Sequence, residues 1–202
     1  RVMGSVNGAF AEYGLMDAGR AFSIPANNMS YEQAATLPVA LNTMHNAVVT
    51  AGALEPGQAV MIQGASSGVG LMAMQIAKFA GAEKVIGSST NPARRAKLTQ
   101  WGADLAIDTS DAAWVDQVLE ETGNKGVDLI IDQVSAGVAN LNLKAARVLG
   151  RIVNVGSISA HVPAPFLAPY AASKAALGAM TRALRRRCAG STWYRCAATR
   201  SR

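Results

Sequence analysis

Residues that bind metals or form disulfides are scarce in this sequence, which has two cysteines and two histidines among 202 residues. Cys188 and Cys196 are eight positions apart and have no histidine near them, so they lack the spacing of a zinc site. We therefore expect no bound metal and no functional role for either cysteine.

Long apolar runs are also missing. No run approaches the roughly 20 residues that a bilayer-spanning helix needs, and the chain begins at Arg1 without the charged-then-apolar leader of a secretory signal. Half of the residues are hydrophobic and 16% are charged, which is typical of globular rather than disordered chains. We expect one well-buried domain with flanking pieces, no membrane partner and a cytoplasmic location.

Acidic residues are absent from the C-terminal end, and this sets the charge balance. After Thr181 the chain has seven arginines and no acid, whereas the first 181 residues have 12 basic and 13 acidic side chains, a net charge of −1. A basic tail can bind polyanions, but a solvated tail is the simpler interpretation. We predict a basic, disordered tail over residues 185–202 and no nucleic-acid partner.

Short β-type runs alternate with helical stretches from Ala59 onward, which is the pattern of a parallel sheet covered by helices. The expected strands are Val60–Gln63, Lys84–Gly87, Asp104–Ile107, Val127–Asp132 and Arg151–Val155. The expected helices are Ala34–Ala51, Val69–Phe79, Pro92–Trp101, Asp111–Thr122, Ala136–Leu149 and Pro169–Leu184. Because crossovers of this length are right-handed, we predict an α/β fold with a doubly wound, Rossmann-type parallel sheet.

A glycine turn after the first expected strand is the strongest sign of a ligand site. The turn consists of Gly64, Ala65, Ser66, Ser67, Gly68, Val69 and Gly70. Glycine lets the backbone approach a pyrophosphate closely, and the N-terminus of the following helix presents free N–H groups to the anion. The spacing departs from GxGxxG, because Ala65 and Ser67 occupy the first two glycine places. A tight turn without a ligand is the alternative.

The end of the second expected strand indicates which cofactor fits. NAD sites place an acid about 20 positions after the glycine turn, where it binds the ribose 2′-hydroxyl. Here Ser88 and Ser89 are followed by Arg94 and Arg95, without an acid. Hydroxyls and guanidinium groups suit a 2′-phosphate, so we predict NADPH in preference to NADH. The alternative is that both arginines lie on a solvated helix face.

Residues from about 8 to 156 resemble the medium-chain dehydrogenase/reductase superfamily, in its zinc-independent quinone oxidoreductase branch. Besides the glycine turn, the resemblance rests on Gly8–Tyr13, Ala34–Pro38, Leu54–Gln58, Gly102–Asp104 and Gly126–Asp132. It implies a dinucleotide-binding Rossmann domain over residues 31–184. Residues 1–30 would be a remnant of an N-terminal, barrel-like catalytic domain, most of which is missing.

The same resemblance implies an NAD(P)H-dependent oxidoreductase that transfers hydride to a quinone or an enone/carbonyl substrate. NADPH would be held by Gly68–Gly70 and Ser88–Arg95, with Val134, Val155 and Gly156 near the nicotinamide. The sequence has no cluster of cysteines and histidines, so a zinc-dependent alcohol dehydrogenase is excluded. The sheet edge beside Arg151–Val155 could pair with a second chain, which makes a homodimer an open expectation.

A second motif follows the last expected strand. Ser157, Tyr170 and Lys174 are spaced by thirteen and then four residues, and the segment from about 150 to 184 resembles the short-chain dehydrogenase/reductase family. On a helix, Tyr170 and Lys174 share one face, where the ammonium group would stabilise a tyrosinate. Tyr170 would exchange a proton with a carbonyl/alcohol pair, and Ser157 would orient the substrate oxygen.

Three functions therefore remain open from the sequence. They are a quinone-reductase-like enzyme, a short-chain-type carbonyl reductase that uses Ser157, Tyr170 and Lys174, and a truncated nucleotide-binding fold without turnover. The family's Asn-Asn-Ala-Gly segment is replaced by Gln133–Gly137, which weakens the second of these.

Overall fold

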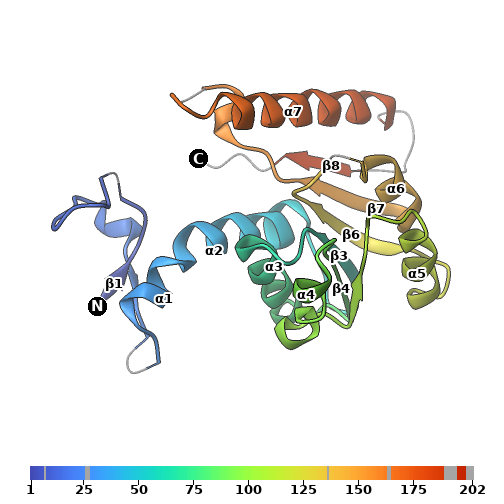
Figure 1. The fold of residues 1–202 in the computed structure, drawn as a ribbon, viewed down its shortest axis with the longest axis horizontal. Helices are drawn as coiled ribbons and strands as arrows, with labels where there is room; N and C mark the ends of the chain where they lie inside the picture. The colour runs from blue at the N-terminus through green and yellow to red at the C-terminus, as the bar shows by residue number, and fades with distance from the viewer. Residues whose placement is uncertain (7, 26–27, 136, 163–164, 189–194, 199–202) are drawn as a thin grey trace.

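A six-stranded parallel sheet, in the order β5-β4-β3-β6-β7-β8, forms the centre of the molecule in a computed structural model (Figure 1). The structure describes residues 1–6, 8–25, 28–135, 137–162, 165–188 and 195–198. The strands are β3 (Ala59–Gln63), β4 (Lys84–Ser88), β5 (Leu105–Ile107), β6 (Val127–Asp132), β7 (Ala146–Asn154) and β8 (Arg195–Ala198). This is the strand order of the Rossmann fold, so the predicted doubly wound α/β architecture is confirmed.

Alternation along the central strands divides the apolar side chains between two core layers. Val60 and Ile62 pack against α3 (Gly68–Phe79) and the end of α2 (Leu37–His45) on one face of the sheet. Met61 points to the opposite face, where it meets Trp114 of α5 (Trp114–Glu121) and the end of α6 (Ala139–Ala145). Both faces are covered, which explains why the central strands are almost continuously apolar.

The residues before the sheet form a small appendage at the far end of α1 (Tyr31–Ala35) from the sheet (Figure 1). Its two-residue strands, β1 (Val2–Met3) and β2 (Phe22–Ser23), pair antiparallel, with η1 (Ala18–Arg20) just before β2. Of the described residues before α1, only Ile24 is buried, and the side chains of Phe10, Tyr13 and Leu15 are at least 90% exposed. This segment has almost no core of its own.

The expected helix Ala136–Leu149 is wrong over its last four residues, Ala146–Leu149. Its first residue lies outside the described residues, α6 ends at Ala145, and β7 begins at Ala146. The alanine-rich sequence favours a helix locally, but pairing with β6 prevails. Ala146 aligns with Val127 and Arg151 with Leu129, and the bulge between them places Leu149 at a positive φ of 65°.

The expected helix Pro92–Trp101 is divided into α4 (Pro92–Arg95) and the 3₁₀ turn η3 (Leu98–Trp101). Its predicted N-cap is confirmed, because Asn91 Oδ1 accepts a hydrogen bond of 3.0 Å from Arg94 N. The expected helix Ala34–Ala51 is likewise divided, into α1, α2 and the π-helical η2 (Asn46–Ala51).

The C-terminal segment differs from the expectation of a disordered tail. The sequence predicts no regular element beyond Leu184, whereas α7 (Ala168–Cys188) continues past it and β8 pairs in parallel with β7. The rest of the predicted tail, residues 189–194 and 199–202, lies outside the described residues. In the part of the chain that the structure describes, no helix is both long and apolar enough to cross a membrane.

Candidate functional site

The carboxyl ends of β3 and β6 mark the point where the strand order reverses, because β4 and β5 lie on one side of this pair and β7 and β8 on the other. In open parallel sheets, ligands bind in the crevice outside the strands at this point. The glycine turn leaves β3 there, and the loop that contains Val134 leaves β6 beside it. The candidate site is this edge of the sheet.

Two glycines of the turn are required by its own geometry. Gly64 has a φ of +68°, and a Cβ atom there would lie 2.9 Å from Cγ2 of Val134. A Cβ atom on Gly70 would lie 2.6 Å from the Gly64 carbonyl oxygen. Gly68 is different, because a Cβ atom there would meet nothing within 4 Å. The space at Gly68 is thus open for a ligand.

Among the described residues, four of the seven amides of the turn have protein acceptors, whereas those of Ser66, Gly68 and Val69 have none. Gly64 N donates to Ser88 Oγ (3.0 Å), Ala65 N to the Ser88 carbonyl oxygen (2.8 Å) and Gly70 N to Ser67 Oγ (3.0 Å). Among the described residues, no protein acceptor pairs with the amides of Gly68 and Val69, which open the 12-residue helix α3. Such first-turn amides bind anions, so these residues fit a pyrophosphate.

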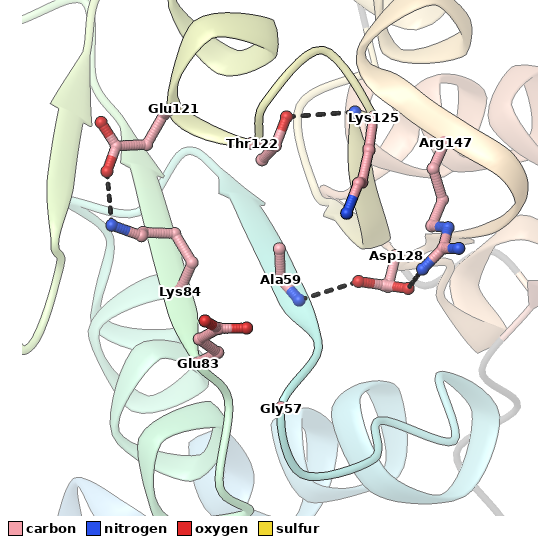
Figure 2. Close-up of a pocket in the computed structure, with 10 residues that line it drawn as sticks. Gly57, Ala59, Glu83, Lys84, Glu121, Thr122, Lys125, Asp128 and Arg147 are labelled. Carbon is pink, nitrogen blue, oxygen red and sulfur yellow. Dashed lines mark hydrogen bonds and ion pairs between the residues drawn. The ribbon is translucent and has the colours of Figure 1, made fainter.

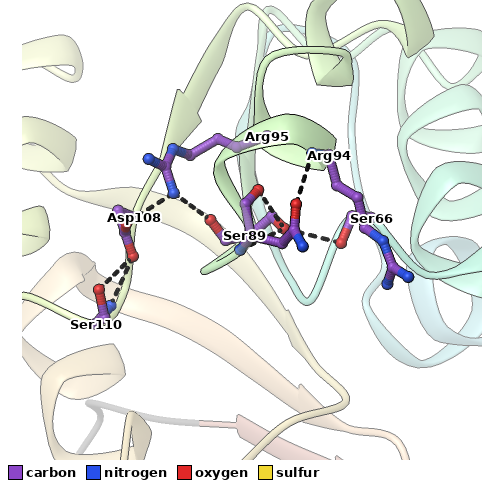
Figure 3. A network of polar contacts seen from close by, with 7 residues as sticks. Ser66, Ser89, Arg94, Arg95, Asp108 and Ser110 are labelled. Atoms are coloured by element: carbon purple, nitrogen blue, oxygen red, sulfur yellow. Dashed lines mark hydrogen bonds and ion pairs between the residues drawn. The ribbon is translucent and has the colours of Figure 1, made fainter.

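The end of β4 places two hydroxyls beside the turn. Ser66 Oγ and Ser89 Oγ share a hydrogen bond of 2.9 Å. The two arginines that follow point in opposite directions (Figure 3): Arg95 reaches Asp108, while the exposed side chain of Arg94 extends away from it on the side of Ser66. The two arginines, which have the same predicted role in the sequence analysis, therefore have different environments in the structure.

Arg95 is already engaged by the protein. Its Nη1 donates to the Ser89 carbonyl oxygen (2.8 Å) and to Asp108 Oδ2 (2.7 Å). The other carboxylate oxygen, Asp108 Oδ1, accepts hydrogen bonds from the hydroxyl and the amide of Ser110 at 2.6 and 3.0 Å. Those bonds from Ser110 and the Arg95 charge hold the pKa of Asp108 below its usual range. Asp108 is thus an ionised partner for Arg95.

A chain of buried hydrogen bonds runs beneath the site from the glycine turn to β6. Ser88 Oγ donates to Gln63 Oε1 (2.7 Å), Gln63 Nε2 to Asn142 Oδ1 (2.7 Å) and Asn142 Nδ2 to Asp132 Oδ2 (2.9 Å). All four of these side chains are at most 1% exposed. The chain joins β4, β3, α6 and β6 into one polar layer.

Asp132 ends this chain and holds the loop that leaves β6. Its Oδ1 accepts hydrogen bonds from Val134 N (2.9 Å) and Ser135 N (2.7 Å), and Ser135 has a positive φ of 64°. Burial raises the pKa of the Asp132 carboxyl, while the two amide bonds and the charge of Lys174 offset part of that rise. The position of Val134, which was predicted to lie near the nicotinamide, therefore depends on Asp132.

The residues of the second motif are only partly brought together. Lys174 Nζ donates to the Val155 carbonyl oxygen (2.8 Å) and lies 5.8 Å from the centre of the Tyr170 ring. Tyr170 is 45% exposed. Ser157 Oγ accepts a hydrogen bond of 3.2 Å from Ser159 N, where it caps the short helix η4 (Ile158–Ala160). Lys174 thus reaches the end of β7, next to Gly156.

Sequence reasoning missed Gln63, Asp132 and Asn142 as site residues. A signal was present for the first two, because each is a polar residue that ends an otherwise apolar strand (Val60–Ile62 and Leu129–Ile131). Asn142 carried no such signal within the expected helix. The described residues contain no group of three His, Cys, Asp or Glu side chains that could hold a metal ion.

Comparison with known proteins finds one matching family and several similar proteins. The family model described as "Zinc-binding dehydrogenase" matches residues 68–195. The hybrid PKS-NRPS synthetase pyvA of Aspergillus violaceofuscus is 35% identical over 136 residues, covering 66% of this chain and 4% of the synthetase. Human quinone oxidoreductase is 29% identical over 157 residues, covering 76% of this chain and 46% of that enzyme.

A solved structure, the CurK enoyl reductase, superposes with a TM-score of 0.64 at 26% identity, covering 70% of this chain and 42% of that one. The chain thus spans less than half the length of human quinone oxidoreductase and of the CurK enoyl reductase chain. The family match also includes residues 150–184, the segment that resembles the short-chain family in the sequence analysis. None of these similarities supports the short-chain resemblance.

The two glycines of the turn give a matched test of its geometry. We expect Gly70→Ala to lower the free energy of unfolding by about 1–3 kcal/mol, because the new methyl group is forced into the Gly64 backbone. Gly68→Ala adds the same atom in open space and should change stability by no more than about 1 kcal/mol. Urea denaturation of both variants measures this, and equal losses would contradict the geometry.

Asp132 predicts a specific pH dependence of stability. Burial raises the pKa of Asp132 in the folded protein, whereas the unfolded chain has an ordinary pKa of about 3.9. At pH values between these two pKa values, the folded protein binds a proton that the unfolded chain has lost. Stability therefore falls as the pH rises through this window. Relative to Asp132→Asn, the wild type should lose up to about 1.4 kcal/mol per pH unit across this window. Urea denaturation between pH 4 and 7 tests it. A pH-independent difference would show that Asp132 titrates normally.

Proposed function

Because the chain belongs to the zinc-binding dehydrogenase family of medium-chain dehydrogenases/reductases, we propose that it binds NADPH at the carboxyl edge of the sheet and serves hydride transfer to a quinone or an enone. The observation that carries this proposal is the pair of unpaired amides at Gly68 and Val69, next to the open space at Gly68. NADPH, when bound, supplies the hydride.

Each part of the cofactor has a candidate partner in this chain. The pyrophosphate would take the Gly68 and Val69 amides, and the nicotinamide would lie by Val134, Val155 and Gly156. A 2′-phosphate would be held by Ser66, Ser89 and Arg94. Arg95 is a support for this loop rather than a ligand, since its guanidinium is held by Asp108 and the Ser89 carbonyl.

The substrate class follows from the relatives, which include quinone oxidoreductases and an enoyl reductase. Quinones and enones share a conjugated carbonyl that accepts hydride. We also propose that residues 1–30 are the end of a neighbouring domain that completes the substrate cleft. The exposed side chains of Phe10, Tyr13 and Leu15 support this, because apolar side chains of this size are usually covered.

Binding and turnover are tested separately with the 202-residue chain. NADPH fluorescence titration should show saturable binding, and Gly68→Ala should weaken it about tenfold while leaving the fold intact. Consumption of NADPH in the presence of a quinone or an enone then establishes turnover. Binding without turnover on either substrate would favour a nucleotide-binding fold without activity, and no binding would refute the proposal.

Arg94 and Arg95 provide a matched pair for the cofactor preference. Arg94→Gln should weaken NADPH binding about tenfold or more and leave NADH binding unchanged, because it removes a charge-assisted contact to the 2′-phosphate alone. Arg95→Gln should weaken both cofactors to a similar degree, because it releases the Ser89 carbonyl. Titrations with the two cofactors measure the ratio. An unchanged NADPH/NADH ratio in Arg94→Gln would refute the role of Arg94.

A carbonyl reductase of the short-chain type is the second candidate, favoured by the position of Lys174 between the Val155 carbonyl and the Tyr170 ring. In that reaction Tyr170 is the proton donor. Tyr170→Phe should then abolish ketone reduction, whereas hydride transfer to a quinone should stay within about twofold of wild type, because it does not use this hydroxyl. Initial rates with a ketone and a quinone distinguish the two candidates.

A further inference from the structure

A second hollow lies at the opposite edge of the sheet, where the strands begin (Figure 2). It has a volume of about 290 Å³ and is formed by the starts of β3, β4, β6 and β7 and by the loop between α5 and β6. Its charged lining residues are Glu83, Lys84, Glu121, Lys125, Asp128 and Arg147. This size is near the lower limit of small-molecule sites, and the whole sheet separates it from the cofactor edge.

Four of the six charges are already paired with one another. Lys84 Nζ forms an ion pair with Glu121, and this contact raises the pKa of Lys84, which keeps it charged. Arg147 Nη1 pairs with Asp128 Oδ1 at 2.7 Å. Asp128 Oδ2 accepts a hydrogen bond of 2.9 Å from Ala59 N. Both oxygens of Asp128 are therefore occupied, and the two pairs form the walls of the hollow.

The other two charges, on Lys125 and Glu83, have opposite signs. Within the described part of the chain, neither side chain forms a hydrogen bond or an ion pair. Figure 2 shows them on different sides of the same space, with the Lys125 ammonium extending into it from the α5–β6 loop and the Glu83 carboxylate from the start of β4. Among the described residues, one positive and one negative group thus face the hollow without a hydrogen bond or an ion pair, and the Glu83 carboxylate has only a longer-range attraction to Lys84.

This charge pattern selects the class of ligand. The lining has three cations and three anions, so a simple anion pairs with Lys125 but faces Glu83 as a like charge, and a simple cation has the reverse problem. A molecule that carries both signs satisfies both groups by charge-assisted hydrogen bonds. We infer that this hollow is a binding site for a small zwitterion of amino-acid or dipeptide size, with its carboxylate at Lys125 and its ammonium group at Glu83.

Three peptides that differ only in charge test the inference by isothermal titration calorimetry. L-Alanyl-L-alanine is the zwitterion, its N-acetyl derivative keeps only the carboxylate, and its C-terminal amide keeps only the ammonium group. Saturable binding of the zwitterion is expected, with each blocked peptide at least about tenfold weaker. No saturable binding of the zwitterion, or equal affinities for all three peptides, overturns the inference.

Variants of the two unpaired residues locate the site. Lys125→Gln and Glu83→Gln should each weaken zwitterion binding about tenfold. Lys144→Gln is the matched control, since Lys144 is exposed and does not line the hollow. All three positions are exposed, so urea denaturation should show native stability. Unchanged affinity in both Lys125→Gln and Glu83→Gln places any binding elsewhere and refutes the assignment.

Discussion

The hydrogen-bond chain from the Gly64 amide to the Asp132 carboxylate is the constraint on which the site depends. The Gly64 N–H donates to Ser88 Oγ, and Ser88 Oγ donates onward to Gln63 Oε1. That bond orients the Gln63 amide, which in turn orients Asn142. An unpaired buried polar group costs about 1–3 kcal/mol, so every member must be satisfied for the others to be stable. The two loops of the cofactor edge are thereby held as one unit.

The hydrogen bonds within the glycine turn also indicate where a ligand would bind. The turn directs the amides of Gly64 and Ala65 to Ser88, and that of Gly70 to Ser67. The amides that remain are those of Ser66, Gly68 and Val69, and the last two lie at the positive end of the α3 dipole. Under the proposed function, the pyrophosphate would bind here because the protein has paired the Gly64, Ala65 and Gly70 amides itself. Gly68, the one glycine of this turn with free space around its Cβ position, lies at the same place.

Local patterns in the sequence were sufficient for the central strands, the glycine turn and the Asn91 cap, because each depends on neighbours within a few residues. Local patterns failed where a residue's environment depends on contacts with other elements of the fold. The start of β7 is decided by pairing with β6 across a bulge, against a local preference for helix. The different environments of Arg94 and Arg95 depend on Asp108, which follows the end of β5. Asn142 is recognisable only once Gln63 and Asp132 are placed on either side of it.

The second motif is connected to the first through β7. Val155 N donates to the Asp132 carbonyl oxygen at 2.8 Å, and the Val155 carbonyl accepts from Lys174 at 2.8 Å. The helix that carries Tyr170 is therefore attached to the same strand end that closes the cofactor edge. A lysine ammonium has three donors, and the bond to Val155 uses one of them. The contact to Val155 therefore places Lys174 at the carboxyl edge of the sheet and leaves two N–H donors of its ammonium group.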